Sequence, residues 1–460
     1  MTNTQLQTTV CKQKNHIIVK LRKVIRLKLK KISAVAGSIA ALTLGLGVMA
    51  PAHASGAQEI TVWAMCSETG EIAAAREQVA AFNGYYEGDY HATLTCKADM
   101  GTAVKSTSVD QLPSVFEFDG ENLAAYVYAG KLKQLDGLVP ASVFSNELVS
   151  IQAEGTYKDG HKYSVSQYDS GLGLYGSKKK LAAAGIKDVP TTWSKAWTAS
   201  RFTQVLSALA AKAPGKKALD IKENYGMGPG WPGYAFTPIV NSAGYQIVTN
   251  GKAVGSLDNA KVVSAFKTFA SWKKYVDPSA DDKAFENGRV GLAWVGHWQY
   301  PAFSKALGKD LVVLPLPNFG AGTKSGQGSH SWGIGKNSAG TELAAANVFL
   351  QYIMQDKWIL NVTDQNGAVP ATKTALNKSV NYRKGGALQL YADQLAASCG
   401  TATPTAKCVT VPRTISAAWP VINTAFGTAM QTIWNGGDAK TALHTAAVTI
   451  DQDNTDHSGY

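Results

Sequence analysis

The order of strand and helix patterns near the start of the chain limits the fold most strongly. The segment EITVWAM (59–65) alternates apolar and polar residues and is rich in β-formers, which indicates a strand. The segment GEIAAAREQVAAFN (70–83) has apolar residues at helical spacing, and YHATLTC (90–96) indicates a second strand. A strand–helix–strand unit favours a parallel sheet covered by helices. We therefore expect an α/β fold.

The same alternation continues along the chain, with no long linker and no internal repeat. GRVGLAWVG (288–296) and DLVVLPLPNF (310–319) predict strands, whereas GTELAAANVFLQYIMQ (340–355) and VINTAFGTAMQTIW (421–434) predict helices. Before another helix, Thr198 is a better candidate for the N-cap than Ser200. The roughly 400 residues after the N-terminal segment suffice for two or three domains, which short crossovers should join.

The N-terminal segment has the features of a secretory signal peptide. Residues 1–54 contain nine Lys or Arg and no Asp or Glu, and include the 19-residue apolar stretch 32–50 before Ala52-His53-Ala54. We expect cleavage before Ser55 and release into the periplasm, because no Cys follows at a lipoprotein position. A transmembrane anchor is the alternative. Residues 55–460 have a net charge of only +3, so a basic nucleic-acid-binding surface is not expected.

Four cysteines remain after Cys11 is removed with the signal peptide, and they allow three pairings. Exported proteins can keep disulfides, and Cys399 and Cys408 enclose a short loop. We expect a Cys399–Cys408 bond and a Cys66–Cys96 bond at the ends of the first two strands, with buried free thiols as the alternative. A zinc site is not expected, since no C-x-x-C spacing or His pair accompanies these cysteines.

Polar and aromatic residues follow several predicted strands at the point where each strand ends. In open α/β sheets this is where ligands bind. Carboxylates accept hydrogen bonds from hydroxyl groups, and an indole can cover the C–H face of a sugar ring, so the set suits a polyhydroxylated ligand. Solvated loops and core packing are the alternatives. The residues are Ser67 and Glu68, Asp119 to Glu121, Asp169 and Ser170, and Gly296 to Trp298.

Motifs along nearly the whole chain resemble the sugar-type extracellular solute-binding proteins of ATP-driven importers, the family of maltose-binding protein. The similar segments, in family order, are FDGENLAAYVYAGKLKQLD, YDSGLGLYGSKKKLAAAGIKDVPTTW, ENGRVGLAWVGHW, LPLPNFG, GSHSWGIGKNSAG, QNGAVPATKTAL and VPRTISAAWPVI. The resemblance implies a two-lobed periplasmic-binding-protein fold, in which each lobe is a sheet flanked by helices. It places hinge crossings near Ser164–Gln167, Val313–Pro315 and Val369–Pro370. One lobe would comprise 55–164 and 315–370, and the other 165–314 and 371–460.

The resemblance also implies which side chains contact a sugar. Trp298 occupies the position that stacks on sugar, whereas Trp294 remains a candidate core residue. The strand end LYGSK and the segment PSVF depart from the family pattern. The full set of implied ligand contacts is Trp298, Asp169, Asp119, Glu121, Trp231, Tyr234, Trp332, Arg413 and Glu68.

The implied partners are a sugar ligand and the membrane permease subunits of an importer, with the protein itself a monomer. No cofactor, metal or nucleic acid is expected, and motifs such as G-x-S-x-G, H-E-x-x-H and G-x-x-x-x-G-K-[ST] do not occur. Two rival functions remain. A glycoside hydrolase would need two placed carboxylates, which Asp119, Glu121 or Asp169 could supply. The same fold could also bind a polyamine, peptide or metal.

Overall fold

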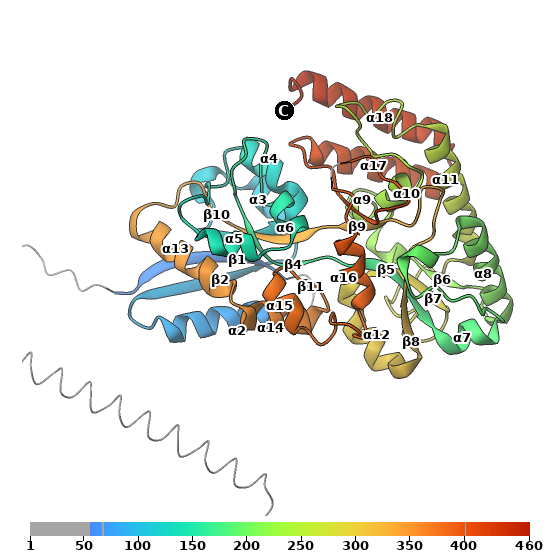
Figure 1. The fold of residues 1–460 in the computed structure, drawn as a ribbon. Helices are drawn as coiled ribbons and strands as arrows, with labels where there is room; N and C mark the ends of the chain where they lie inside the picture. The colour runs from blue at the N-terminus through green and yellow to red at the C-terminus, as the bar shows by residue number, and fades with distance from the viewer. Residues whose placement is uncertain (1–55, 67–68, 401) are drawn as a thin grey trace, which may run out of the picture. The chain divides into compact units, whose positions relative to one another are not determined.

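The computed structural model describes residues 56–66, 69–400 and 402–460. The predicted signal peptide and the predicted mature N-terminus at Ser55 lie outside the described residues. The described strands form two main sheets and one short pair, and each main sheet carries its own helices (Figure 1). We call the six-stranded sheet with its helices the first lobe, and the four-stranded sheet with its helices the second lobe.

The sheet of the first lobe has the strand order β11-β4-β10-β3-β1-β2. β1 pairs in parallel with β2 and β3, as predicted, whereas β10 and β11 pair antiparallel with their neighbours. The expectation of parallel sheets is wrong at these strands, because β10 and β11 run back against β3 and β4. The strands are β1 (Gln58–Met65), β2 (Tyr90–Lys97), β3 (Val115–Asp119), β4 (Val165–Asp169), β10 (Ser329–Ile334) and β11 (Val369–Pro370).

Helices cover this sheet and bury its apolar residues. Ile60, Val62 and Ala64 alternate with more exposed residues along β1, so one face of the strand enters the core. Phe82 of α2 and Phe349 of α13 meet in that core, with ring centroids 5.1 Å apart. The helices are α2 (Thr69–Tyr85), α3 (Met100–Ser106), α4 (Leu123–Tyr128), α5 (Ala141–Asn146), α6 (Val149–Glu154), α13 (Gly340–Ile353), α14 (Asp356–Asn366) and α15 (Lys373–Lys378).

The sheet of the second lobe has the order β6-β7-β5-β8, with β5 antiparallel to both β7 and β8 and only β6–β7 parallel. A short parallel pair, β9–β12, lies beside it. Trp294 of β7 is fully buried in the core of this lobe. The strands are β5 (Leu172–Ser177), β6 (Leu219–Asp220), β7 (Leu292–Gly296), β8 (Leu311–Leu314), β9 (Ser325–Gln327) and β12 (Thr410–Pro412).

The helices of the second lobe follow the predicted patterns closely. Thr198 is the N-cap of α8, since its hydroxyl accepts a hydrogen bond from the Arg201 N–H, as predicted. α17 begins at Trp419, with Pro420 in its first turn, where proline is tolerated. The helices are α7 (Lys178–Ala183), α8 (Ala199–Lys212), α9 (Trp231–Ala235), α10 (Thr237–Ser242), α11 (Ala260–Ser271), α12 (Tyr300–Leu307), α16 (Gln389–Ala396), α17 (Trp419–Trp434) and α18 (Ala439–Asp456).

The chain passes between the two sheets three times, at places that differ from the expected ones. β4 lies in the first sheet and β5 in the second, so the first crossing is Ser170–Gly171 rather than Ser164–Gln167. The second crossing is at Gly328, between β9 and β10. The chain before β9 still belongs to the second lobe, because Leu316 packs in the core of that lobe. We place the third after α15, whose Ala375 packs in the core of the first lobe.

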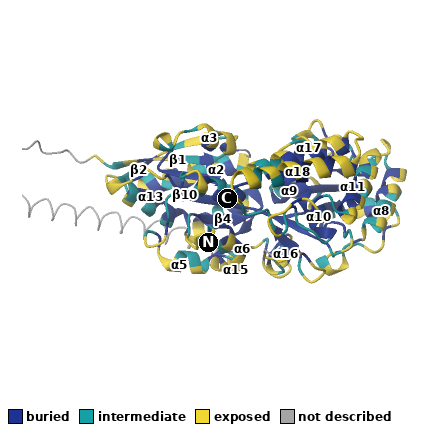
Figure 2. Ribbon diagram, turned by 90° about the horizontal axis from the view of Figure 1, so that it is seen from above, coloured by how far each residue is buried: buried dark blue, intermediate teal, exposed yellow. Residues whose placement is uncertain are grey.

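Burial follows the two lobes (Figure 2). The central strands of both sheets are largely buried, whereas the outward faces of α5 and α15 are exposed. No helix within the described part of the chain is both long enough and apolar enough to cross a bilayer. Both predicted disulfides are present: Cys66–Cys96 joins the ends of β1 and β2, and Cys399–Cys408 closes the loop before β12.

Candidate functional site

Residues of both lobes line a cavity of about 440 Å³. Asp119 ends β3 and Glu121 lies in the 3₁₀ turn Gly120–Asn122 that follows it. From the second lobe, the residues that follow β7 and β12 reach the same cavity. Six predicted contacts therefore come together there, although they are distant in the sequence: Asp119, Glu121, Trp231, Tyr234, Trp298 and Arg413.

Aromatic side chains of the second lobe form one wall of the cavity. The ring of Trp298 lies 5.8 Å from that of Trp231 and 5.9 Å from that of Tyr234. Hydrogen bonds hold both indoles: Trp231 Nε1 donates to the Ile221 carbonyl (3.0 Å) and Trp298 Nε1 to the Tyr225 hydroxyl (3.3 Å). Such a wall can cover the apolar face of a ring-shaped ligand.

Gly296 explains how Trp298 reaches this position. The indole of Trp298 folds back over the end of β7, so that a Cβ atom at position 296 would lie 2.1 Å from a ring carbon. Only glycine leaves room for this close approach. The Gly-His-Trp order after the strand therefore determines the direction of the Trp298 ring.

An ion pair between Glu121 and Arg413 joins the two lobes inside the cavity. Both side chains are at least nine-tenths buried, and the guanidinium lies 5.2 Å from the Tyr234 ring. Burial raises the pKa of Glu121, and the charge of Arg413 opposes this shift. Among the described residues, Glu121 Oε2 and Arg413 Nε have no hydrogen-bond partner, and the same holds for Asn423 Oδ1.

His330 of β10 also lines the cavity, although the sequence analysis did not single it out. Its ring stacks on Tyr168 and lies within 2.7 Å of that residue's hydroxyl, and its nitrogens lie 3.4 Å from Glu117 and 3.6 Å from Asp119. Burial disfavours the imidazolium, but the hydrogen bond with Glu117 and the charge of Asp119 raise the pKa of His330 to about 9. These partners come from other strands, so no local pattern identifies this histidine.

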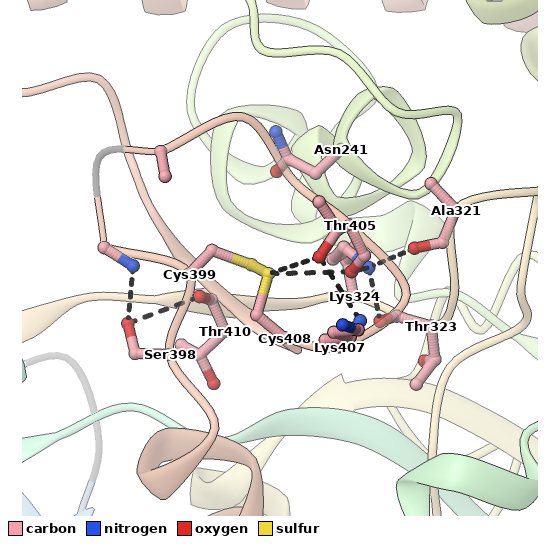
Figure 3. Close-up of a disulfide and its surroundings, with 12 residues drawn as sticks. Asn241, Ala321, Thr323, Lys324, Ser398, Cys399, Thr405, Lys407, Cys408 and Thr410 are labelled. Atoms are coloured by element: carbon pink, nitrogen blue, oxygen red, sulfur yellow. Dashed lines mark hydrogen bonds between the residues drawn. A yellow bond between two sulfur atoms is a disulfide. The ribbon is translucent and has the colours of Figure 1, made fainter.

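The disulfide loop 399–408 holds the strand that leads to Arg413 (Figure 3). The buried Lys324 amine donates to the carbonyls of Ala321 (2.5 Å), Thr323 (3.1 Å) and Thr405 (3.0 Å), which ties this loop to the segment before β9. β12 then pairs with β9 and ends one residue before Arg413. A Cβ atom at Gly328 would lie 1.9 Å from the Arg413 guanidinium, so the guanidinium lies directly against the hinge crossing.

Two predicted contacts, Asp169 and Trp332, do not line the cavity. Asp169 is fully buried, and its carboxylate accepts hydrogen bonds from the N–H groups of Ser170 (2.8 Å) and Gly328 (3.2 Å). It thus ties two hinge crossings together, and burial, with a contribution from Glu154, raises its pKa to about 7. Trp332 instead packs in the core of the first lobe, because it faces the helices rather than the hinge. Glu68 lies outside the described residues.

Other residues of the cavity were also missed. Trp419 and Asn423 lie in the first turns of α17, and Asp99 precedes α3. The sequence contained a local signal for Trp419 alone among these three residues, because the Trp-Pro pair marks the N-terminus of a helix. Within the described residues, no group of three or more His, Cys, Asp or Glu side chains is arranged to hold a metal ion.

Comparisons with known proteins show the family and the fold of the chain. Residues 79–389 match the family model described as bacterial extracellular solute-binding protein. The fold is similar to that of the cyclic alpha-maltosyl-1,6-maltose binding protein of Arthrobacter globiformis (21% identity, TM-score 0.67, covering 86% of this chain and 99% of that one). It is also similar to the GacH receptor of Streptomyces glaucescens, solved with acarbose (18%, 0.69, 87% and 98%).

A third similar structure is the maltose/maltodextrin-binding domain of Bdellovibrio bacteriovorus bound to maltotriose (16% identity, TM-score 0.68, 86% of this chain and 100% of that one). No curated protein matches the chain. The structural similarities confirm the predicted two-lobed α/β fold.

Proposed function

The chain belongs to the family of bacterial extracellular solute-binding proteins, and from this premise we propose that it captures a carbohydrate between its two lobes. The cavity between the lobes carries the proposal. Its aromatic wall suits the C–H face of a sugar ring, and buried polar atoms of Glu121, Arg413 and Asn423 lack partners among the described residues. A sugar presents hydroxyl groups that both donate and accept hydrogen bonds, so it can satisfy all three atoms at once.

In this proposal the protein is a monomeric carrier without catalytic activity. It delivers the sugar to the permease subunits of an ATP-driven importer, and it works in the periplasm after removal of residues 1–54. The similar structures include a cyclic alpha-maltosyl-1,6-maltose binding protein and a domain bound to maltotriose, which supports a carbohydrate ligand. The proposed lobes are 56–169 with 329–378, and 172–327 with the chain after α15.

A thermal-shift screen against neutral mono- and oligosaccharides tests the proposal most directly. A ligand that binds only the folded protein stabilises it, by about 2.7 kcal/mol at a concentration one hundred times its Kd. We expect at least one neutral sugar to raise the melting temperature and to be recovered uncleaved. Stabilisation by a polyamine, peptide or metal ion and by no sugar would contradict the proposal, as would cleavage of the sugar.

Small-angle scattering tests the proposed closure of the lobes around the ligand. The crossings at Ser170–Gly171 and Gly328 join the lobes through short segments, which suits hinge bending. We expect a smaller radius of gyration with a saturating sugar than without it. An unchanged radius would indicate a rigid, preformed cavity.

A further inference from the structure

Both cationic side chains of the cavity are already paired with carboxylates of the protein. Apart from tyrosine, the ionisable side chains of the cavity are Asp99, Asp119, Glu121, His330 and Arg413. Asp99 accepts a hydrogen bond from the Thr102 N–H (2.9 Å) as the N-cap of α3. Asp119 lies 3.6 Å from the His330 ring, and Glu121 forms the ion pair with Arg413. An anionic ligand would therefore find no unpaired cation among the described residues that line the cavity, and Asp99, the lining carboxylate that has no cationic partner among them, is exposed to solvent.

The Glu121–Arg413 pair differs from the other pairs in two ways. It is the more deeply buried, since the Asp119 side chain is 36% exposed and those of Glu121 and Arg413 are 6% and 10% exposed. It also joins the two lobes, and each partner keeps one polar atom, Oε2 or Nε, that no described residue satisfies. The pair can accept one hydroxyl hydrogen and donate to one hydroxyl oxygen while its own charges stay neutralised.

We propose that the Glu121–Arg413 ion pair is the charge filter of the site: it admits uncharged sugars and excludes uronates and amino sugars. This inference rests on the proposed function. A carboxylate on the ligand would approach Glu121 with like charge, and an ammonium group would approach Arg413 in the same way. Either ligand would bring a buried charge that the neutralised pair does not compensate.

Two single variants should change the selectivity in opposite directions. Glu121→Gln leaves the Arg413 charge without its partner, so the site should prefer an anionic sugar. Arg413→Gln leaves the Glu121 carboxylate without its partner, so the site should prefer a cationic sugar. The double variant Glu121→Gln/Arg413→Gln removes both charges and keeps hydrogen-bonding groups at both positions. It is the matched control, and it should again prefer the neutral sugar.

The probes are matched sugars that differ at one group: glucose, glucosamine and glucuronate, and the corresponding galactose set, with maltotriose as a neutral oligosaccharide. Calorimetry and thermal shift at neutral pH, where the uronates are ionised and the amines are largely protonated, report binding. For the wild type we expect the neutral member of a set to bind at least about tenfold more tightly than either charged member. For Glu121→Gln we expect the uronate to become the preferred member by a similar factor.

The melting midpoint without ligand shows whether each variant folds, and if one single variant does not fold, the other single variant tests the filter against the double variant. Wild-type binding of a uronate or an amino sugar as tightly as its neutral counterpart would overturn the charge filter and leave the proposed function standing. Neutral preference retained in both single variants would do the same. Failure of every sugar to bind any of the four proteins would overturn the proposed function itself.

Discussion

Trp294 and Trp298 lie four residues apart in the chain, yet their surroundings differ. Trp294 is in the middle of β7, fully buried, with its ring 5.9 Å from Phe236 and its Nε1 donating to the Ala235 carbonyl (3.1 Å). Trp298 follows the end of the same strand, is only partly buried, and lines the cavity between the lobes. One indole belongs to the core of a lobe and the other to the candidate binding site.

The difference shows that the position of an aromatic residue along a strand determines its role more than its type does. Inside β7, neighbouring strands and helices surround the side chain on every side. Beyond Gly296 the chain leaves the sheet, and the indole lies on the backbone of the strand end with its other side toward the cavity. Substitutions at the two positions should therefore change different measurable quantities.

The largest effect is expected for Trp294→Ala. Removing a fully buried indole leaves a cavity in the core of the second lobe, so the free energy of unfolding should fall by roughly 3–5 kcal/mol. The sugar affinity of the molecules that remain folded should change little, because Trp294 does not line the cavity. A urea melt and a calorimetric titration of the same sample measure both quantities. Lost affinity with unchanged stability would show that the core assignment is wrong.

The next effect is expected for Trp298→Ala, and it concerns affinity. If the indole covers ~80–120 Å² of a sugar ring, its loss costs roughly 2–3 kcal/mol of binding free energy, or about 30- to 150-fold in Kd. Trp298→Phe is the matched control, since it keeps a smaller ring at the same place and should lose less. An unchanged Kd together with a strongly lowered melting midpoint would contradict the proposal that Trp298 stacks on the sugar ring.

The outline of both lobes could be predicted because strands and helices bury one face each. The predicted strand 59–65 is observed as Gln58–Met65, and the predicted helix 421–434 starts two residues earlier. The crossings were placed wrongly because a hinge strand has no distinctive pattern. β4 is buried along its whole length between β10 and β11, so it looks like any core strand.

The candidate site was predictable where the family resemblance placed a residue just beyond a strand, as for Trp298, Asp119 and Glu121. It was not predictable where the role depends on partners distant in the sequence. Asp169 follows the same pattern as Asp119, yet its carboxylate binds the backbone of two crossings that no local pattern reveals. The pairing of Arg413 with Glu121 likewise depends on how the two lobes meet.

His297, which directly precedes Trp298, allows a comparison of stability at different pH values. It is buried, and its Nδ1 accepts a hydrogen bond from the Gly171 N–H (3.3 Å). Burial, with a smaller contribution from the charge of His330, lowers the pKa of His297 to about 3. The unfolded chain binds this proton near pH 6.5 and the folded protein does not. The stability that His297 contributes is therefore present above pH ~6.5 and is lost as the pH falls toward 3.

We expect the wild type to lose about 2 kcal/mol of stability relative to His297→Asn between pH 6.5 and pH 5. Asparagine has an oxygen that can accept the same hydrogen bond but does not titrate, so the difference between the two proteins isolates the histidine from other titrating groups. Urea melts at a series of pH values measure it. Parallel pH profiles for the two proteins would contradict the lowered pKa.

The smallest effect is expected for Tyr225→Phe, which changes the orientation of Trp298 without removing its ring. The Tyr225 hydroxyl accepts hydrogen bonds from Trp298 Nε1 (3.3 Å) and Gln299 Nε2 (3.0 Å), so it holds the indole in its place against the cavity. Losing one such bond costs about 0.5–1.5 kcal/mol, which corresponds to roughly a two- to twelvefold weaker affinity. Tyr163→Phe is the control, because that hydroxyl donates to Asp159 (2.7 Å) and does not line the cavity.

Equal affinities for both variants and the wild type would mean that the Trp298 ring is held by packing alone. A weaker affinity in Tyr225→Phe only, with Trp294→Ala leaving affinity unchanged, would show that the site depends on orientation as well as on aromatic area.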